Sequence, residues 1–328
     1  MEHLIEYDGC RLYRLPPFAR VERYIASTPG TRAIANDPMI CGTDYTDLMR
    51  VSVTLTLSSC AKADIVVGEE RNTSVLHILR GGLNYGLRGA LKIAYGWKRH
   101  CADFLSSQRD HEGDVWYVKE KEYKKVEELV PDTDLIFGDV VATGVSLENA
   151  LLTFIPMCVE QKAPIRRITF FTIGGQRAEQ LLATADVRCR KEFPGYQGAR
   201  VIYFEGIFGV ADKTSPLRIA IPDTDLLRHP AVLAPEFVAS QAESLSYPLE
   251  RCSIYDAGSR AFKPHKHLED VHEYWTQVLA FAKAGTTYLD YLQERFPTDP
   301  RLTQEIPAEW KTADLLSDVA RKQMHLAH

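Results

Sequence analysis

Short apolar runs alternate with amphipathic segments through the middle of the chain. Continuous apolar runs suit strands that are buried on both faces of a sheet. The strand-like runs lie at residues 74–79, 135–137, 165–175, 200–211 and 217–225. Residues 86–97 and the segment that begins at Leu147 place their apolar side chains on one helical face. This alternation of strands and helices predicts an α/β fold with a parallel sheet.

The N-terminal part of the chain has a less regular pattern. Residues 1–30 contain a strand-like start, a Pro-Pro pair that breaks it and a segment that we interpret as a short helix. Residues 50–58 alternate strictly between apolar and polar side chains and are rich in β-branched residues. This period of two predicts an edge or hairpin strand, with a helix as the alternative.

From residue 229 onward the pattern changes to helices, which are interrupted by Pro248, Gly285, Pro297 and Pro307. We therefore divide the chain into residues 1–225, an α/β domain with an N-terminal extension, and residues 226–328, a mainly helical region. We expect the helical region to cap a site on the first domain or to form a dimer interface.

The strand at residues 135–137 leads through a glycine-containing turn into a helix, and this turn has the features of a phosphate site. Amide groups at a helix N-terminus, Gly144 and the hydroxyl groups of Thr143 and Ser146 all favour an anion with several oxygens. Asp139 would repel a phosphate. We expect its carboxylate to accept hydrogen bonds from sugar hydroxyls or to lie near Mg²⁺ through water. The alternative is an ordinary turn with a serine as the helix N-cap.

A second glycine turn follows the strand at residues 74–79 and precedes a helix from about Tyr85. Its candidate anion-binding residues are Arg80, Gly81, Gly82 and Asn84. The glycines let backbone amides point toward phosphate oxygens, and a guanidinium group can grip an anion with paired hydrogen bonds. Both turns follow the carboxyl ends of strands, where parallel sheets bind ligands, so they can converge on one ligand. The alternative is a plain turn beside a surface arginine.

Together the two turns resemble the phosphoribosyl pyrophosphate (PRPP) motifs of the type I phosphoribosyltransferases. The segment ATGVS at residues 142–146 is similar to ATGGS in the uracil phosphoribosyltransferase branch, and ILRGGLNY at residues 78–85 is similar to ILRAGLGM there. One position departs from the motif. Most of the superfamily has two adjacent acids and the uracil branch keeps the first, whereas here Gly138 stands first and only Asp139 is acidic.

The resemblance implies a type I phosphoribosyltransferase core with a C-terminal helical extension, in a Mg²⁺-dependent enzyme. Such an enzyme transfers the phosphoribosyl group of PRPP to a nitrogen of a pyrimidine-like or other small heterocyclic acceptor and releases pyrophosphate. Mg²⁺ would be bound through PRPP, without direct protein ligands, and we expect a homodimer. Two alternatives stay open: a catalytically idle regulator that senses PRPP or a nucleotide, and an enzyme of specialised metabolism whose acceptor is not a nucleobase.

The resemblance also implies which residues are catalytic. Asp139 would bind the ribose hydroxyls. Arg109 would stand at the start of a flexible flap that spans residues 110–126. Gly113-Asp114 is the expected tip of a hairpin in this flap. Flap lysines could neutralise pyrophosphate when the flap closes, although a charged run is also typical of a solvated face. These lysines are Lys119, Lys121, Lys124 and Lys125.

Three groups of binding residues follow from the same resemblance. The 5′-phosphate would be bound by Ala142, Thr143, Gly144, Val145 and Ser146. Pyrophosphate would be bound by Arg80, Gly81, Gly82 and Asn84. The late segment DAGSRAF resembles the base-binding loop D-A-G-D-R-x-F of the uracil branch, with a plain turn as the alternative. The resemblance of this segment implies that the acceptor would be bound by Asp256, Ala257, Gly258 and Arg260.

Composition and charge exclude several other classes of protein. A net charge of −5 argues against a nucleic-acid partner. We expect a cytoplasmic protein, because the first residues do not read as a signal peptide and no apolar run approaches membrane-spanning length. The seven cysteines contain no C-x-x-C pair, and His265, His267 and His272 include no i, i+4 pair. We therefore expect no metal site built on these side chains.

Overall fold

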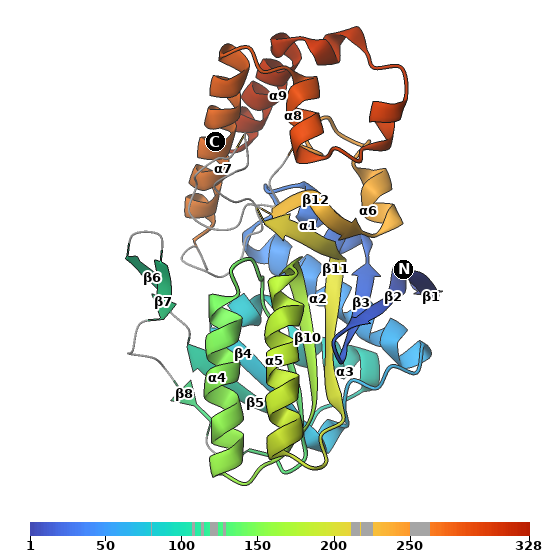
Figure 1. Cartoon of the computed structure of the whole chain (residues 1–328), viewed down its shortest axis with the longest axis vertical. Coiled ribbons are helices and arrows are strands. Elements are labelled where there is room, and N and C mark those ends of the chain that lie inside the picture. The colour runs from blue at the N-terminus through green and yellow to red at the C-terminus, as the bar shows by residue number, and fades with distance from the viewer. Residues whose placement is uncertain are drawn as a thin grey trace.

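The computed structural model describes residues 1–79, 81–106, 109–112, 115–118, 124–126, 129–210, 217, 226–249 and 263–328, with the backbone alone at 109–112, 115–118 and 124–125. Within these residues, ten strands form one sheet with helices on both of its faces (Figure 1). The central strands are parallel, which confirms the predicted α/β fold with a parallel sheet. No helix in the described ranges is long and apolar enough to cross a membrane.

The order of the strands in the sheet differs from their order in the chain. Across the sheet they are β1 (Glu2–Tyr7), β2 (Cys10–Phe18), β3 (Val21–Ser27), β11 (Gly198–Val210), β10 (Ile165–Gly175), β9 (Thr133–Gly138), β4 (Thr73–Leu79), β5 (Cys101–Ser106) and β8 (Lys124–Lys125), and β12 (Leu226–Leu233) also pairs with β11. Every neighbouring pair from β3 to β5 is parallel. The side chains of β4, β9 and β10 are almost all buried, as expected for strands that are covered on both faces.

The chain changes its direction of travel across the sheet between β4 and β9. After β4 it adds β5 on one side, and it then returns to place β9 on the other side of β4, with β10 and β11 further out. In an open parallel sheet, ligands bind in the crevice at such a switch point, beyond the carboxyl ends of the strands. The two predicted phosphate turns follow the two strands that meet there.

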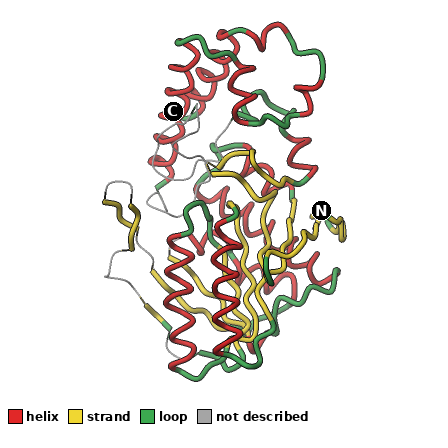
Figure 2. Tube along the Cα trace, viewed as in Figure 1, coloured by secondary structure: helices red, strands yellow, loops and turns green. Residues whose placement is uncertain are grey.

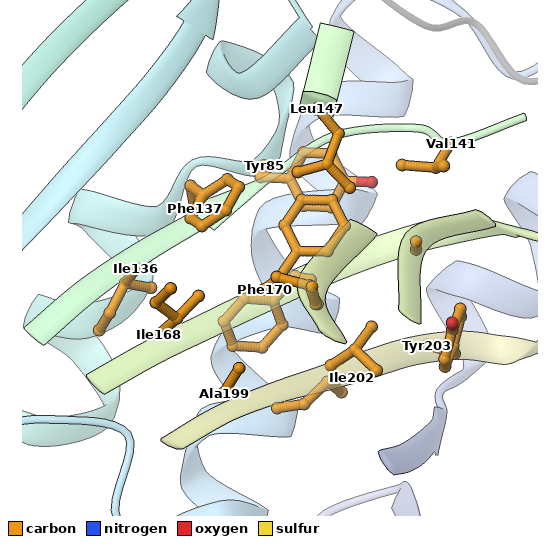
Figure 3. Close-up of a cluster of buried hydrophobic side chains, with 14 of the residues drawn as sticks. Tyr85, Ile136, Phe137, Val141, Leu147, Ile168, Phe170, Ala199, Ile202 and Tyr203 are labelled. Atoms are coloured by element: carbon orange, nitrogen blue, oxygen red, sulfur yellow. The ribbon is translucent and has the colours of Figure 1, made fainter. Parts of the chain in front are cut away.

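Two helical layers cover the sheet (Figure 1). α4 (Val145–Glu160) and α5 (Arg177–Glu192) lie on one face, and α1 (Pro29–Asn36), α2 (Gly42–Lys62) and α3 (Leu87–Tyr95) lie on the other. Aromatic side chains pack between neighbouring strands on both faces. The rings of Phe137 and Phe170 have centroids 4.8 Å apart, and those of Phe171 and Phe204 are 6.2 Å apart. Part of this buried core is drawn in Figure 3.

The predicted strand at residues 50–58 is wrong, because these residues lie inside the long helix α2. Its buried side chains recur every three or four residues and include Tyr45, Met49, Ser52, Val53, Thr56, Leu57 and Cys60. Two of the polar positions are buried because they are hydrogen-bonded. Thr28 Oγ1 donates to Ser52 Oγ at 2.8 Å, and Thr56 Oγ1 donates to the Ser52 carbonyl at 2.8 Å. Hydroxyl side chains therefore form part of the buried face, which the apolar pattern alone does not reveal.

The short helix predicted within residues 1–30 is also misplaced. Residues 21–27 form β3, and α1 begins only at Pro29. Pro16 and Pro17 lie inside β2, at a shift in its register with β3 between Leu15 and Phe18. Proline is tolerated at such an irregularity because the missing backbone N–H breaks no ladder hydrogen bond there.

The helices predicted for the C-terminal part are present. They are α6 (Pro235–Ser240), α7 (Pro264–Lys283), α8 (Tyr288–Arg295) and α9 (Ala313–Leu326), with the 3₁₀ turns η3 (Pro300–Thr303) and η4 (Ala308–Lys311). They enclose a separate apolar core around Tyr274, Trp275 and Leu316. Most of them lie beyond the carboxyl ends of the parallel strands (Figures 1 and 2). Residues 226–233 belong to the region predicted as mainly helical but form β12, which extends the sheet.

Two hydrogen bonds, the first buried and the second partly buried, join the C-terminal helices to the α/β part. His267 of α7 donates from Nε2 to the carbonyl oxygen of Pro38 at 2.7 Å. His229 of β12 donates from Nδ1 to the carbonyl oxygen of Arg295, at the end of α8, at 2.8 Å. Both bonds join residues that lie far apart in the sequence, so they fix the position of these helices relative to the sheet.

The helical nature of residues 50–58 can be tested with two valines that a strand would place on the same face. In α2, Val53 is fully buried, whereas Val51 is 47% exposed. Val53→Ala should lower the free energy of unfolding by about 2 kcal/mol, and Val51→Ala should change it by less than about 0.5 kcal/mol. Urea denaturation measures both values. Equal losses for the two variants would contradict the helix.

Candidate functional site

The two predicted phosphate turns lie together at the carboxyl ends of β4 and β9. These strands pair in parallel, and the 3₁₀ turn η2 (Gly81–Tyr85) follows β4 while residues 139–144 follow β9. The turns touch at two glycines. A Cβ atom added at Gly82 would lie 3.2 Å from the carbonyl oxygen of Gly138, so the backbones are in close contact there. The convergence expected from the sequence is therefore present in the fold.

The turn after β9 continues along β10 before it enters α4. Asp139 N–H donates to the Phe171 carbonyl at 3.2 Å, and Val141 N–H donates to the Ile173 carbonyl at 3.1 Å. Gly175 N–H donates in return to the Val141 carbonyl at 2.9 Å. These backbone bonds hold the first half of the turn rigidly against the sheet.

The second half of the turn enters α4 through a glycine with a left-handed backbone. Gly144 is the N-cap residue of α4, with a left-handed φ of +77°, and as a glycine it has no side chain with which to cap the helix. Ser146 therefore lies inside the first turn and is not the N-cap, contrary to the plain-turn alternative. The amides of the first helical turn have no acceptors within the helix and carry the positive end of its dipole. Thr143 is exposed and Ser146 is half-buried, so both hydroxyls can reach a ligand, while Ala142 is buried.

Asp139 lies at the entrance of this loop with 8% of its surface exposed. Its Oδ1 accepts a hydrogen bond from the amide of Val140, the next residue, at 3.0 Å. This bond fixes one carboxylate oxygen toward the backbone. The carboxylate is thereby held next to residues 142–146, the predicted 5′-phosphate loop.

Gly138 is covered by the aromatic ring of Tyr85, which the sequence did not indicate. A Cβ atom at Gly138 would lie 2.6 Å from Cδ1 and 2.7 Å from Cγ of Tyr85, closer than real Cβ atoms approach. Tyr85 is 1% exposed, and its hydroxyl accepts a hydrogen bond from Ile173 N–H at 3.3 Å. Figure 3 shows Tyr85 at the end of β9. The space that an acidic side chain at residue 138 would need is thus filled.

Two further charged or titratable side chains adjoin the turns. Arg177, at the start of α5, lies against Gly144: a Cβ atom there would be 2.7 Å from its Cγ. Its Nη2 also pairs with Glu148 Oε2 at 3.2 Å, and both side chains are about half exposed. His77, in β4, stacks on Phe104 with centroids 5.0 Å apart. Burial lowers the pKa of His77, a hydrogen bond with the Gly82 backbone opposes this, and Arg88 lowers the pKa further, so the imidazole is neutral at pH 7.

A buried carboxyl group, Glu205, lies in β11 toward the same edge of the sheet. It is fully buried, with φ of +63°, and it accepts hydrogen bonds from Ser27 Oγ at 2.6 Å, from Thr28 N–H at 3.0 Å and from the Thr31 hydroxyl. Burial raises the pKa of Glu205 to about 7, although these bonds and Arg32 oppose the rise. A single charged residue inside an apolar run was the only sequence signal for it.

Several predicted site residues lie outside the described residues. These are Arg80, Lys119, Lys121 and the candidate base loop with Asp256, Ala257, Gly258 and Arg260. For Arg109, Lys124 and Lys125 the backbone alone is described. The arms of the predicted hairpin are present: β6 (Arg109–Glu112) pairs antiparallel with β7 (Val115–Val118), and Gly113-Asp114 connects them in sequence. The hairpin lies beside α4 (Figure 1).

The chain matches no protein-family model, and no curated protein is significantly similar to it in sequence. Among the described residues, no group of three or more His, Cys, Asp or Glu side chains could hold a metal ion. The function of the protein is therefore inferred from the geometry of the two turns and from the short motifs that form them.

The raised pKa of Glu205 predicts a pH-dependent stability. Its carboxyl group titrates near 4.5 in the unfolded chain and near 7 in the folded protein. Between these values the unfolded state loses its proton first, so the free energy of unfolding falls as pH rises, by up to about 3 kcal/mol in total. Glu205→Gln should remove this fall.

Urea denaturation of both proteins between pH 4.5 and pH 7 measures this difference. Glu160→Gln, at an exposed position of α4, is the control and should follow the unaltered protein. Parallel pH profiles for Glu205→Gln and the unaltered protein would rule out the raised pKa.

Proposed function

We propose that this chain is a Mg²⁺-dependent phosphoribosyltransferase built on a type I phosphoribosyltransferase core. It transfers the phosphoribosyl group of PRPP to a nitrogen of a pyrimidine-like or other small heterocyclic acceptor. One observation carries the proposal: the two glycine turns that resemble PRPP motifs are in contact at the switch point of a parallel sheet. This is where such a sheet binds a phosphorylated ligand.

The 5′-phosphate of PRPP would be bound by the loop from Ala142 to Ser146. The first-turn amides of α4, the helix dipole and the hydroxyls of Thr143 and Ser146 supply donors for a dianion. Gly144 lets the chain enter the helix with a left-handed backbone, which is strained for other residues. Arg177 adds a positive charge next to this loop, and a phosphate could compete with Glu148 for it.

Pyrophosphate would lie against the other turn, at Gly81, Gly82 and Asn84, with the proposed help of Arg80 and Arg109. Mg²⁺ usually keeps several waters when it is bound through substrate phosphates, and the Asp139 carboxylate at this edge would meet the ion through such a water. The ion would neutralise the charge of the departing pyrophosphate when it is bound. The residues present therefore fit a magnesium ion that arrives with PRPP.

Catalysis at such a site depends on positioning and electrostatics. A bond between C1′ and the pyrophosphate oxygen breaks while the acceptor nitrogen forms a new one, and the ribose carries positive charge in between. Asp139 would hold the ribose hydroxyls and stabilise this charge. The β6–β7 hairpin would act as the flap that excludes water, and the segment at residues 256–260, whose sequence resembles a base-binding motif, would bind the acceptor.

A second candidate function is favoured by the packing of Tyr85 on Gly138. Because this packing leaves no room for a first acidic side chain, the site could bind PRPP or a nucleotide without transferring the sugar. The protein would then act as a sensor. The two candidates share the binding site and differ in the chemical step, so one experiment separates them.

The proposal predicts that pyrophosphate is released when the protein is mixed with PRPP, Mg²⁺ and one of a panel of pyrimidines and other small heterocycles. Calorimetric titration with PRPP and Mg²⁺ in the absence of an acceptor should show binding. Binding without release by any acceptor would favour the sensor. Absence of PRPP binding would contradict both candidate functions.

Replacing the remaining acid tests its role in ribose binding. Asp139→Asn keeps an oxygen for the Val140 amide but removes the charge. The change should weaken PRPP affinity or turnover by about 1.5 to 3 kcal/mol, the typical contribution of a hydrogen bond to a charged group. Asp132→Asn is a matched control at an exposed turn, where its left-handed φ of +55° also suits asparagine. Unchanged PRPP binding and turnover in Asp139→Asn would falsify the ribose role.

A further inference from the structure

Tyr85, the last residue of the η2 turn, contacts three neighbouring strands. Its ring covers Gly138 of β9, its hydroxyl accepts a hydrogen bond from Ile173 of β10, and its ring centroid lies 6.4 Å from that of Phe204 of β11. It is 1% exposed, so it does not itself meet a ligand. Its contacts instead determine where the η2 turn stands relative to the rest of the sheet edge.

Space and not backbone conformation explains the glycine at residue 138. Gly138 does not belong to the glycines with positive φ, so its backbone would accept any residue. Among the described residues, the three atoms nearest to an added Cβ atom all belong to the ring of Tyr85. Gly82, in the same turn as Tyr85, packs against the Gly138 carbonyl oxygen. The η2 turn therefore contacts the end of β9 at two points, through Gly82 and through Tyr85. The position of the η2 turn and the position of the phosphate loop after β9 are therefore coupled through these packing contacts.

We propose that Tyr85 is a positioning residue that sets the distance between the two phosphate turns. This inference rests on the proposed function and deepens it: the site takes one ligand with anionic groups at both ends of a sugar-sized unit. Such a ligand gains affinity from binding both turns at once, and this gain is lost when the turns are at the wrong distance. A ligand that binds only one turn is insensitive to the distance.

The same packing links two departures from the motif of the uracil branch. Tyr85 stands where the quoted segment ILRAGLGM has its methionine, and Gly138 stands where that branch has its acid. In this chain the ring of Tyr85 occupies the space that a side chain at residue 138 would need. An acid restored at residue 138 needs a smaller residue at position 85.

Binding of three probes tests the positioning role. Calorimetry compares PRPP with Mg²⁺, ribose 5-phosphate alone, and pyrophosphate with Mg²⁺. Gly138→Ala pushes the ring away, and it should weaken PRPP by at least about tenfold while each single-turn probe changes by less than about threefold. Tyr85→Phe keeps the ring and should retain PRPP binding within about threefold. Gly195→Ala is the control, since a Cβ atom there meets nothing within 4 Å.

A stability cycle tests the packing without any ligand. Gly138→Ala should lower the urea midpoint in the unaltered chain, and it should have no such effect in a Tyr85→Ala chain, where the ring is gone. An equal loss in both backgrounds would overturn the packing on which the inference stands. The binding arm needs no Tyr85→Ala protein, so it decides the question even if that variant does not fold.

The outcomes separate this inference from the proposed function. If the unaltered protein binds PRPP, and Gly138→Ala weakens all three probes equally or none of them, the positioning role is overturned while the function stands. If the unaltered protein does not bind PRPP at all, both proposals fail. A selective loss of PRPP affinity in Gly138→Ala, together with a stability effect that requires the Tyr85 ring, supports the positioning role.

Discussion

The parallel pairing of β4 with β9 is the constraint on which the rest of the site depends. It aligns the carboxyl ends of two strands whose side chains are almost all buried, so neither strand can slide without exposing apolar surface. A buried charge network fixes the same register at the opposite edge. Asp134, at the start of β9, is fully buried and accepts hydrogen bonds from the Glu69 amide, at 2.8 Å, and from Arg166 and Arg167 of β10. Leaving a buried carboxylate without such partners strongly destabilises the folded protein. The network therefore holds the amino ends of β9 and β10 in place.

At the carboxyl edge of the sheet, glycines allow neighbouring segments to pack unusually close to one another. Gly82 touches the carbonyl of Gly138, Gly138 lies under the ring of Tyr85, and a Cβ atom at Gly174 would lie 2.3 Å from the Val141 carbonyl oxygen. None of these three glycines has a positive φ, so each is needed for space. Glycines in such motifs are usually taken as a means to expose amides to phosphate. Here they also let the backbone of one turn pass directly against another.

Titratable side chains at this edge come from segments that are far apart in the chain. Arg177 lies against Gly144 from the start of α5, and Glu205 is buried in β11 beside the hydroxyl groups of Ser27, at the end of β3, and Thr31, in α1. His77 lies in β4 directly under the η2 turn. Each of them is a single residue in an otherwise ordinary segment. Their proximity to the site follows from the strand order, which brings β3, β11, β10, β9 and β4 together at one edge.

The sequence alone determined β4, β9, β10 and β11, the helix after Gly144, the arms of the hairpin and the convergence of two glycine turns, because these depend on local period and on the rule that parallel strands end at one edge. The strand predicted at residues 217–225 lies outside the described residues except for residue 217. The sequence failed for α2, where buried Ser52 and Thr56 have their hydrogen bonds satisfied by tertiary neighbours and by the helix itself. It also marked Gly138 as the position that departs from the motif. Only the tertiary structure decided what that departure is, because the ring that fills the space arrives from a different turn, and no local pattern records which atoms occupy a volume.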